Sequence, residues 1–164
     1  MSDHTRPFKA GDHAEVFPGL GHDPYQLRGK LHEPSVCPSC GVVYTGGRWQ
    51  WLPRPADAQE AACIACRRTA DRLPAGYLTI DGDFAAQHQV EIIDLLRRDE
   101  TRTRAQHPMK RIMSIESNGG ATLVQVTDVH YTRDLGEALK SAFQGTLDIK
   151  YSRDQDLARV HWRR

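Results

Sequence analysis

The sequence of 164 residues lacks any apolar run near the ~20 residues that cross a bilayer. Its first residues also contain no apolar segment of a signal peptide. We therefore expect a protein that is neither exported nor inserted in a membrane, which places it in the cytoplasm. An excess of one charge is missing too, because 22 Lys and Arg accompany 21 Asp and Glu, for a formal net charge of +1. That balance excludes a polycation that coats nucleic acid indiscriminately, and it leaves room for local basic clusters.

Most sequence motifs of catalysis are absent as well. The glycine pairs 46–47 and 119–120 fit hairpin turns and form no phosphate-binding loop, and no serine occupies a nucleophile elbow. Only the segment 127–130 combines a hydroxyl, a carboxylate and an imidazole. Helix capping explains its first two residues, so an enzyme that uses Asp128 and His130 is the minor alternative. We expect a protein without enzymatic activity and without a small-molecule substrate.

All four cysteines fall in two pairs of the same spacing, Cys37-Pro38-Ser39-Cys40 and Cys63-Ile64-Ala65-Cys66. A two-residue gap lets both thiolates of a pair turn toward one point, and two pairs supply the four sulfurs of a tetrahedral metal site. The spacing is that of a zinc ribbon. Because a four-thiolate site leaves no position for water or substrate, we predict one structural Zn²⁺, with the ligands Cys37, Cys40, Cys63 and Cys66.

Four cysteines at this spacing have three other possible uses: disulfides, redox pairs and an iron–sulfur cluster. Two disulfides agree poorly with the missing export signal, because cytosolic thiols are kept reduced. Thioredoxin-like redox pairs occur singly at the start of a helix, whereas this chain has two pairs. An iron–sulfur cluster also accepts four thiolates and stays an alternative to zinc.

The segment between the two pairs predicts a hairpin that turns at Gly46-Gly47. Trp49 and Trp51 alternate along its second strand and therefore point to the same face. We favour their use as a cover over the metal, with stacking platforms for bases as the alternative. Pro53-Arg54-Pro55 ends the strand, and residues 56–62 are predicted to form a short helix before the second cysteine pair.

The chain divides into three predicted parts. Residues 1–33 contain four of the eight histidines and no periodicity, which indicates a flexible N-terminal arm that orders on a partner. Residues 34–76 form the zinc ribbon. Residues 77–164 show the alternation of strands and helices that is typical of a compact α+β domain.

Within this last part, the apolar pattern predicts strands at 77–80, 111–116, 122–126, 147–151 and 158–162, and helices at 84–105 and from Thr127 or Asp128 to 143. This order is close to the split βαβ plan, in which both helices cover one face of an antiparallel sheet. The predicted fold class is therefore α+β, a four-cysteine zinc ribbon followed by a split βαβ-like antiparallel sheet with two helices. Its open face is a common place for RNA or a partner protein to bind.

Basic residues cluster in the ribbon, between residues 97 and 111, and at the C-terminus. Arginine dominates these clusters, and its guanidinium suits phosphate contacts and stacking on bases. We therefore expect RNA or the ribosome as the partner. The candidate contacts are Arg48, Arg67, Arg68, Arg97, Arg98, Arg102, Arg104, Lys110 and Arg111. The alternative is an adaptor that docks a partner protein through the ribbon and the open sheet face.

Several motifs also carry a resemblance to known proteins. In the ribbon these are Cys37-Pro38-Ser39-Cys40-Gly41, Gly47-Arg48-Trp49-Gln50-Trp51, Cys63 and Cys66 with Arg67-Arg68, and Pro74-Ala75-Gly76. In the following domain they are His107-Pro108-Met109-Lys110-Arg111-Ile112, Thr127-Asp128-Val129-His130, Gly136-Glu137-Ala138-Leu139 and Arg159-Val160-His161-Trp162.

From about residue 22 to its end, the chain resembles a group of short uncharacterised bacterial zinc-ribbon proteins. More remotely, it is similar to the nonsense-mediated-decay protein three family, the export adaptors of the large ribosomal subunit in eukaryotes and their archaeal relatives. That resemblance implies a role in binding the ribosome or its RNA. Those adaptors contain further zinc-binding pairs and further domains, so only the binding role is carried over.

Overall fold

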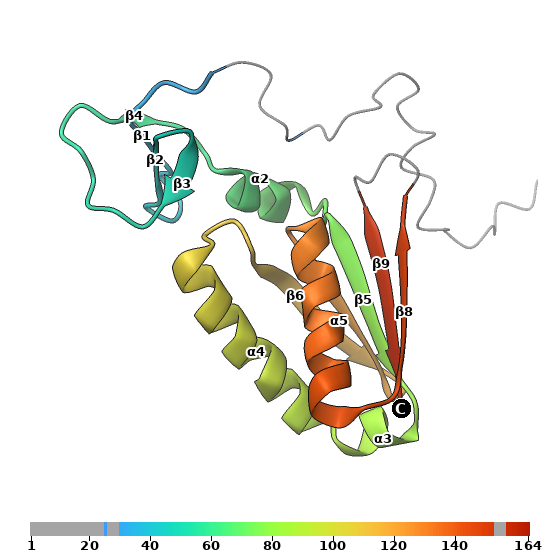
Figure 1. Ribbon diagram of the computed structural model, residues 1–164. Helices are drawn as coiled ribbons and strands as arrows, with labels where there is room; N and C mark the ends of the chain where they lie inside the picture. Colours follow the sequence, from blue (N-terminus) through green and yellow to red (C-terminus); the bar gives the residue numbers. More distant parts are fainter. Residues whose placement is uncertain (1–24, 26–29, 153–156) are drawn as a thin grey trace, which may run out of the picture.

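The computed structural model describes Tyr25, residues 30–152 and residues 157–164 (Figure 1). In this part of the chain, two β-sheets and four helices form a mixed α+β structure, which confirms the predicted fold class. Most of the predicted N-terminal arm, residues 1–33, lies outside the described residues, and so does the tip of the last predicted hairpin.

The first sheet belongs to the ribbon and has the order β3-β2-β1-β4. Its strands are β1 (Ser35–Val36), β2 (Val43–Thr45), β3 (Arg48–Gln50) and β4 (Gln59–Glu60). The hairpin of β2 and β3 turns at Gly46 and Gly47, whose φ angles of 60° and 75° suit glycine. The predicted hairpin is thereby confirmed.

The predicted helix over residues 56–62 is wrong, because part of this segment forms β4. Gln59 and Glu60 pair in parallel with β1. The amide of Gln59 donates to the Pro34 carbonyl at 3.1 Å, and that of Ala61 donates to the Val36 carbonyl at 3.0 Å. These backbone groups therefore find their partners in a neighbouring strand instead of in a helical turn, a choice that local propensity does not reveal.

The second sheet forms the α+β domain and has the order β6-β7-β5-β9-β8. Its strands are β5 (Gly76–Asp81), β6 (Ile112–Asn118), β7 (Ala121–Val126), β8 (Thr146–Tyr151) and β9 (Ala158–Arg163). One detail departs from the predicted antiparallel sheet: β9 pairs in parallel with β5. The inward side chains Ala158, Val160 and Trp162 of β9 are buried, whereas β8 is largely exposed, so the more apolar strand takes the inner position.

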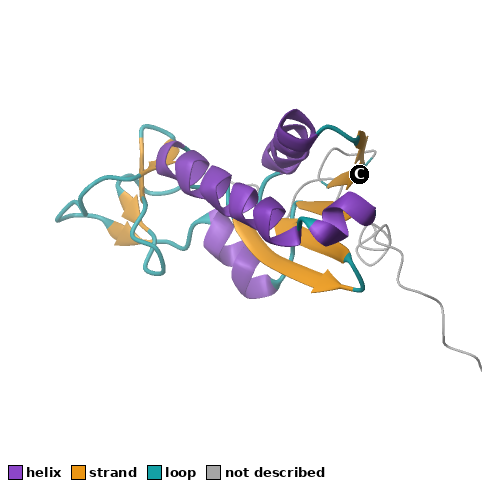
Figure 2. Cartoon of the chain, turned by 90° about the horizontal axis from the view of Figure 1, so that it is seen from below, coloured by secondary structure: helices purple, strands orange, loops and turns teal. Residues whose placement is uncertain are grey.

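Three helices accompany this sheet: α3 (Asp83–Gln87), α4 (Gln89–Gln106) and α5 (Val129–Phe143). The helix predicted over 84–105 is interrupted at His88, whose backbone leaves the helical region. Helices α4 and α5 lie over the same face of the sheet, as the split βαβ plan requires (Figures 1 and 2). Each of them crosses between two parallel strands that are separated by other strands.

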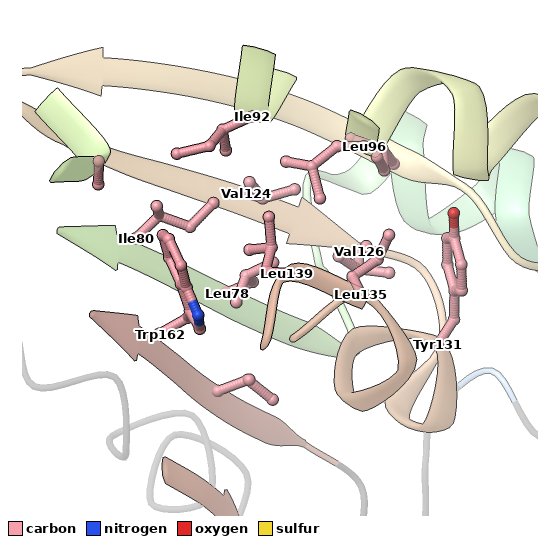
Figure 3. Packing of buried hydrophobic residues seen from close by; sticks show 13 residues of the cluster. Leu78, Ile80, Ile92, Leu96, Val124, Val126, Tyr131, Leu135, Leu139 and Trp162 are labelled. Carbon is pink, nitrogen blue, oxygen red and sulfur yellow. The ribbon is translucent and has the colours of Figure 1, made fainter. Parts of the chain in front are cut away.

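The main core lies between these two helices and the sheet (Figure 3). Ile92 and Leu96 of α4 and Leu135 and Leu139 of α5 pack on Leu78, Val124 and Trp162, among other residues of the cluster. The ribbon has a separate, smaller core around its cysteines.

The ribbon lies beside the C-terminal end of α4 (Figures 1 and 2). No helix in the described ranges is long and apolar enough to cross a membrane.

Candidate metal centre

The four cysteines meet at one point of the ribbon. The sulfurs of Cys37, Cys40, Cys63 and Cys66 all lie within 4.8 Å of one another, and none of them forms a disulfide. Tetrahedral zinc with Zn–S bonds of about 2.3 Å separates its sulfurs by about 3.8 Å. The Cys40 and Cys63 sulfurs are 3.8 Å apart. The residues therefore fit a single four-coordinate ion, and the prediction of one structural Zn²⁺ is confirmed.

This spacing also bears on the alternatives. Disulfides are excluded, since all four cysteines of the chain are free. An iron–sulfur cluster places several iron ions between its thiolates and needs sulfurs farther apart than a single ion does. A closed site of four thiolates leaves no open coordination position, so an ion held there would stabilise the fold.

The two cysteine pairs reach the site through different local structures. After Cys37 the chain makes a tight turn, in which the amide of Gly41 donates to the Cys37 carbonyl at 2.8 Å and Gly41 adopts a φ of 79°. Cys63 is instead the N-cap of α2 (Ile64–Asp71), where its sulfur accepts a hydrogen bond from the amide of Cys66. The helix N-terminus thus directs backbone N–H groups at a thiolate, which favours the charged form.

The pKa values of the thiols reflect burial and backbone donors. Burial opposes the ionisation of Cys37, but the amides of Cys63, Cys40 and Ser39 lower its pKa to about 6. Burial raises the pKa of Cys63 and of Cys66. A bound Zn²⁺ supplies the positive charge that holds all four sulfurs as thiolates.

A small apolar cluster encloses the metal site. Trp49 is buried and packs with Val42 and Ala65 against the cysteines, and the Tyr44 ring packs at a tilt against Trp49 with ring centres 5.2 Å apart. This confirms the metal-covering role of Trp49. Trp51 lies outside β3 and is 39% exposed, so it does not share that role.

The structure adds a fifth side chain to the four cysteines. Arg111, from the segment between α4 and β6, reaches the site with its guanidinium 3.3 Å from the sulfurs of both Cys40 and Cys66. It is 7% exposed, which removes it from the predicted nucleic-acid contacts. Although burial opposes its charge, the neighbouring thiolates raise the pKa of Arg111. Nothing in the sequence distinguishes Arg111 from the other cations of its cluster.

Arg68 is buried too, so its predicted contact with nucleic acid is also wrong. It is 5% exposed, its Nη1 donates to the Leu73 carbonyl, and its guanidinium lies 4.5 Å from the centre of the Tyr25 ring. Its role is to fix the end of α2. Arg48 and Arg67 are exposed on the ribbon, and Arg67 also contacts the Tyr25 ring.

The remaining predicted contacts are spread over α4 and its C-terminal end. Arg97, Arg98 and Arg102 are exposed on the outer side of the helix. Arg104 lies against Trp51, and the half-buried Lys110 pairs with Asp134 at 3.4 Å. Three of the nine predicted cations therefore share one open surface on α4. The other six lie on the ribbon, in buried positions, or in contacts with Trp51 and Asp134.

The residues of the possible catalytic group at 127–130 have separate contacts. Asp128 caps α5 by accepting the amide hydrogen of Tyr131 at 2.7 Å. Thr127 is buried and bonded to the Met109 carbonyl and the Arg111 amide, and His130 is exposed. The predicted cap is confirmed, and the hydroxyl has a structural role beneath Arg111.

Searches of protein-family models, of curated proteins and of solved structures gave no match to this chain.

Proposed function

We propose that this protein is a non-enzymatic, cytoplasmic zinc-ribbon protein that binds RNA on the ribosome through the outer face of α4. The observation that carries the proposal is the exposed set Arg97, Arg98 and Arg102, which we call the arginine stripe. Arg98 and Arg102 are four positions apart and share one side of the helix, and Arg97 is adjacent to Arg98. With Asp94 and Thr101, they line a shallow, open hollow on the surface.

Two acidic residues of the same helix, Asp99 and Glu100, are turned away from the surface, whereas Asp94 is exposed within the hollow. Asp99 and Glu100 have side chains that are only 12% and 14% exposed. Asp99 accepts a hydrogen bond from the hydroxyl of Tyr131, and Glu100 accepts one from the amide of Ile112. Each also pairs with an arginine of the stripe, which leaves that guanidinium with further donors directed to solvent.

An aromatic surface lies at the C-terminal end of the stripe. The Trp51 ring is partly exposed and is held against α4 by the Arg104 carbonyl. Arginines beside an exposed aromatic ring are the combination that single-stranded RNA uses, because phosphates pair with guanidinium groups and bases stack on rings. The resemblance to ribosome-binding zinc-ribbon adaptors points in the same direction.

The proposal is tested by RNA binding of the full-length protein at several salt concentrations. We expect affinity to fall with salt, and the triple variant Arg97→Gln, Arg98→Gln, Arg102→Gln to reduce the slope of log affinity against log salt by about 2, at about 0.7 per contact for single strands. The matched control, Arg54→Gln, Lys140→Gln, Lys150→Gln, removes three other exposed cations and keeps the slope. Equal slopes for the two triple variants would reject the arginine stripe.

Association with the ribosome has its own test. In sucrose gradients of native lysate at low salt, we expect the protein to sediment with ribosomal particles and to leave them at high salt. Sedimentation at the top of the gradient in every condition, including stationary phase, would reject the ribosome as the partner. RNA binding as such is decided separately, by the affinity measurement at several salt concentrations.

A protein-binding adaptor is the second candidate. Trp51 and the neighbouring Leu52 are 39% and 44% exposed, which favours an apolar contact at this place. Such a contact predicts a partner that stays bound after nuclease treatment and at high salt. RNA binding predicts the opposite for both treatments.

A further inference from the structure

The guanidinium of Arg111 bridges the two parts of the molecule. Its Nη1 donates to the Cys66 sulfur at 3.3 Å, and its Nη2 donates to the Cys40 sulfur at 3.3 Å and approaches the Cys63 sulfur at 3.8 Å. The three cysteines belong to the ribbon, whereas Arg111 belongs to the segment that leads into β6. The planar guanidinium thus contacts two thiolates with two separate nitrogens, a geometry that lysine cannot reproduce.

Backbone contacts hold Arg111 in place from the side of the α+β domain. Its Nε donates to the Pro108 carbonyl at 2.7 Å. Its amide donates to the hydroxyl of Thr127 at 2.9 Å, and its carbonyl accepts from the Thr127 amide at 3.0 Å. These contacts fix the orientation of the side chain, so the guanidinium is directed at the sulfurs.

Charge explains why the contact matters. Four thiolates and one Zn²⁺ carry a total charge of −2, and a buried guanidinium requires a counter-charge. Within residues 30–152 and 157–164, no carboxylate forms an ion pair with Arg111. The metal-bound thiolates are therefore the counter-charge of Arg111, and Arg111 halves the negative charge of the centre.

We infer that Arg111 is an outer-shell residue of the zinc centre and that the pair formed by Arg111 and the metal-bound thiolates anchors the ribbon on the α+β domain. In this arrangement, zinc does more than fold the ribbon: its occupancy also sets whether the two parts of the molecule stay joined. Met109, two residues before Arg111, also packs against the ribbon core. This inference does not require RNA binding.

The first test measures zinc affinity by competition with a chelator in the full-length protein. Outer-shell partners typically change metal affinity by about 10–100-fold, so we expect Arg111→Gln to weaken zinc binding by that factor. Arg111→Lys keeps the positive charge but loses the two-nitrogen guanidinium contact, so its zinc affinity should fall less than that of Arg111→Gln. Arg98→Gln is the matched control, because it also removes one arginine charge but lies on the exposed side of α4.

A spectroscopic readout separates a direct effect on sulfur from a general loss of structure. In the cobalt-substituted protein, hydrogen bonds from Arg111 stabilise the sulfur electrons and raise the energy of the sulfur-to-cobalt charge-transfer band. We expect this band to move to lower energy in Arg111→Gln and to stay in place in Arg98→Gln. Unchanged zinc affinity and an unshifted band in Arg111→Gln would overturn the outer-shell role.

The anchoring role is tested in the unaltered chain, which avoids variants that fold poorly. We expect chelation of zinc to increase hydrogen exchange at the amides of Lys110 and Arg111, and at the indole of Trp51, while the central strands β5 and β7 stay protected. Exchange that increases only inside the ribbon, with residues 110 and 111 unchanged, would overturn the anchoring role.

Discussion

The indole nitrogen of Trp51 donates a hydrogen bond to the backbone carbonyl of Arg104 at 2.8 Å, across 53 positions of sequence. The guanidinium of Arg104 lies 5.7 Å from the centre of the same ring. The loop after β3 is thereby attached to the last turn of α4. This contact joins the ribbon to the α+β domain in addition to the one made by Arg111.

The first prediction concerns this link. Trp51→Phe keeps an aromatic ring and removes the N–H donor, so we expect the free energy of unfolding to fall by about 1 kcal/mol, the net worth of one hydrogen bond. Chemical denaturation of the zinc-loaded protein measures it. Leu52→Ala, at the next and also exposed position, is the control and should stay within about 0.5 kcal/mol of the parent. An unchanged Trp51→Phe protein would mean that the bond adds nothing to stability.

The second prediction concerns the metal. Elemental analysis should find one zinc per chain in the parent protein and none in Cys66→Ser, since three thiolates cannot close the site. Far-UV circular dichroism of this variant should keep most of its signal, because the core of the α+β domain is separate from the ribbon core. Ser39→Ala, between two ligands, is the control that retains zinc. Iron in place of zinc in the parent protein would contradict the assignment.

The third prediction concerns Thr127. Thr127→Val keeps the shape of the side chain but leaves the buried amide of Arg111 without its acceptor. We expect a loss of about 1–3 kcal/mol in the free energy of unfolding, the penalty for an unsatisfied buried polar group. Thr127→Ser retains the hydroxyl and should lose less. A Thr127→Val protein as stable as Thr127→Ser would show that the hydroxyl is dispensable.

The fourth prediction is a pH dependence. Burial, with the hydrogen bond and the negative charge of Asp71, raises the pKa of Tyr25 from 10 to about 12, although Arg68 and Arg67 oppose the shift. A group with a raised pKa stabilises the fold fully below its unfolded pKa and loses that contribution above its folded pKa. The stability difference between the parent and Tyr25→Phe should therefore be constant below pH 10 and shrink between pH 10 and 12. Urea denaturation at each pH measures it, and a difference that does not change over this window would show that Tyr25 ionises normally.

Local patterns determined much of the fold. The turn at Gly46-Gly47 needs left-handed backbone, which glycine supplies, and Asp128 caps α5 through a contact three residues away. Apolar periodicity located the strands of the larger sheet. Local patterns were misleading over residues 56–62, where the partner that decides the conformation, β1, lies more than twenty positions earlier in the chain.

For the charged residues, too, the sequence shows where they cluster, and only the structure shows which of them are exposed. A cluster of cations from residue 97 to 111 is visible in the sequence, but the sequence does not state which of them face solvent. Arg98 is exposed on α4, whereas Arg111 is buried against thiolates from residues 40 and 66. Burial depends on which distant segment packs over a side chain, and composition does not contain that information.

By itself, the sequence determined the metal site, because a spacing of two residues within each cysteine pair brings both thiolates to one point whatever surrounds them. It likewise determined the α+β class through its alternating periodicities. Only the tertiary structure decided that β9 lies inside β8, that Asp99 and Glu100 turn inward while the arginine stripe faces solvent, and that Arg111 meets the thiolates. These features arise from contacts between segments far apart in the chain, where burial and charge pairing are settled by packing and not by neighbouring residues.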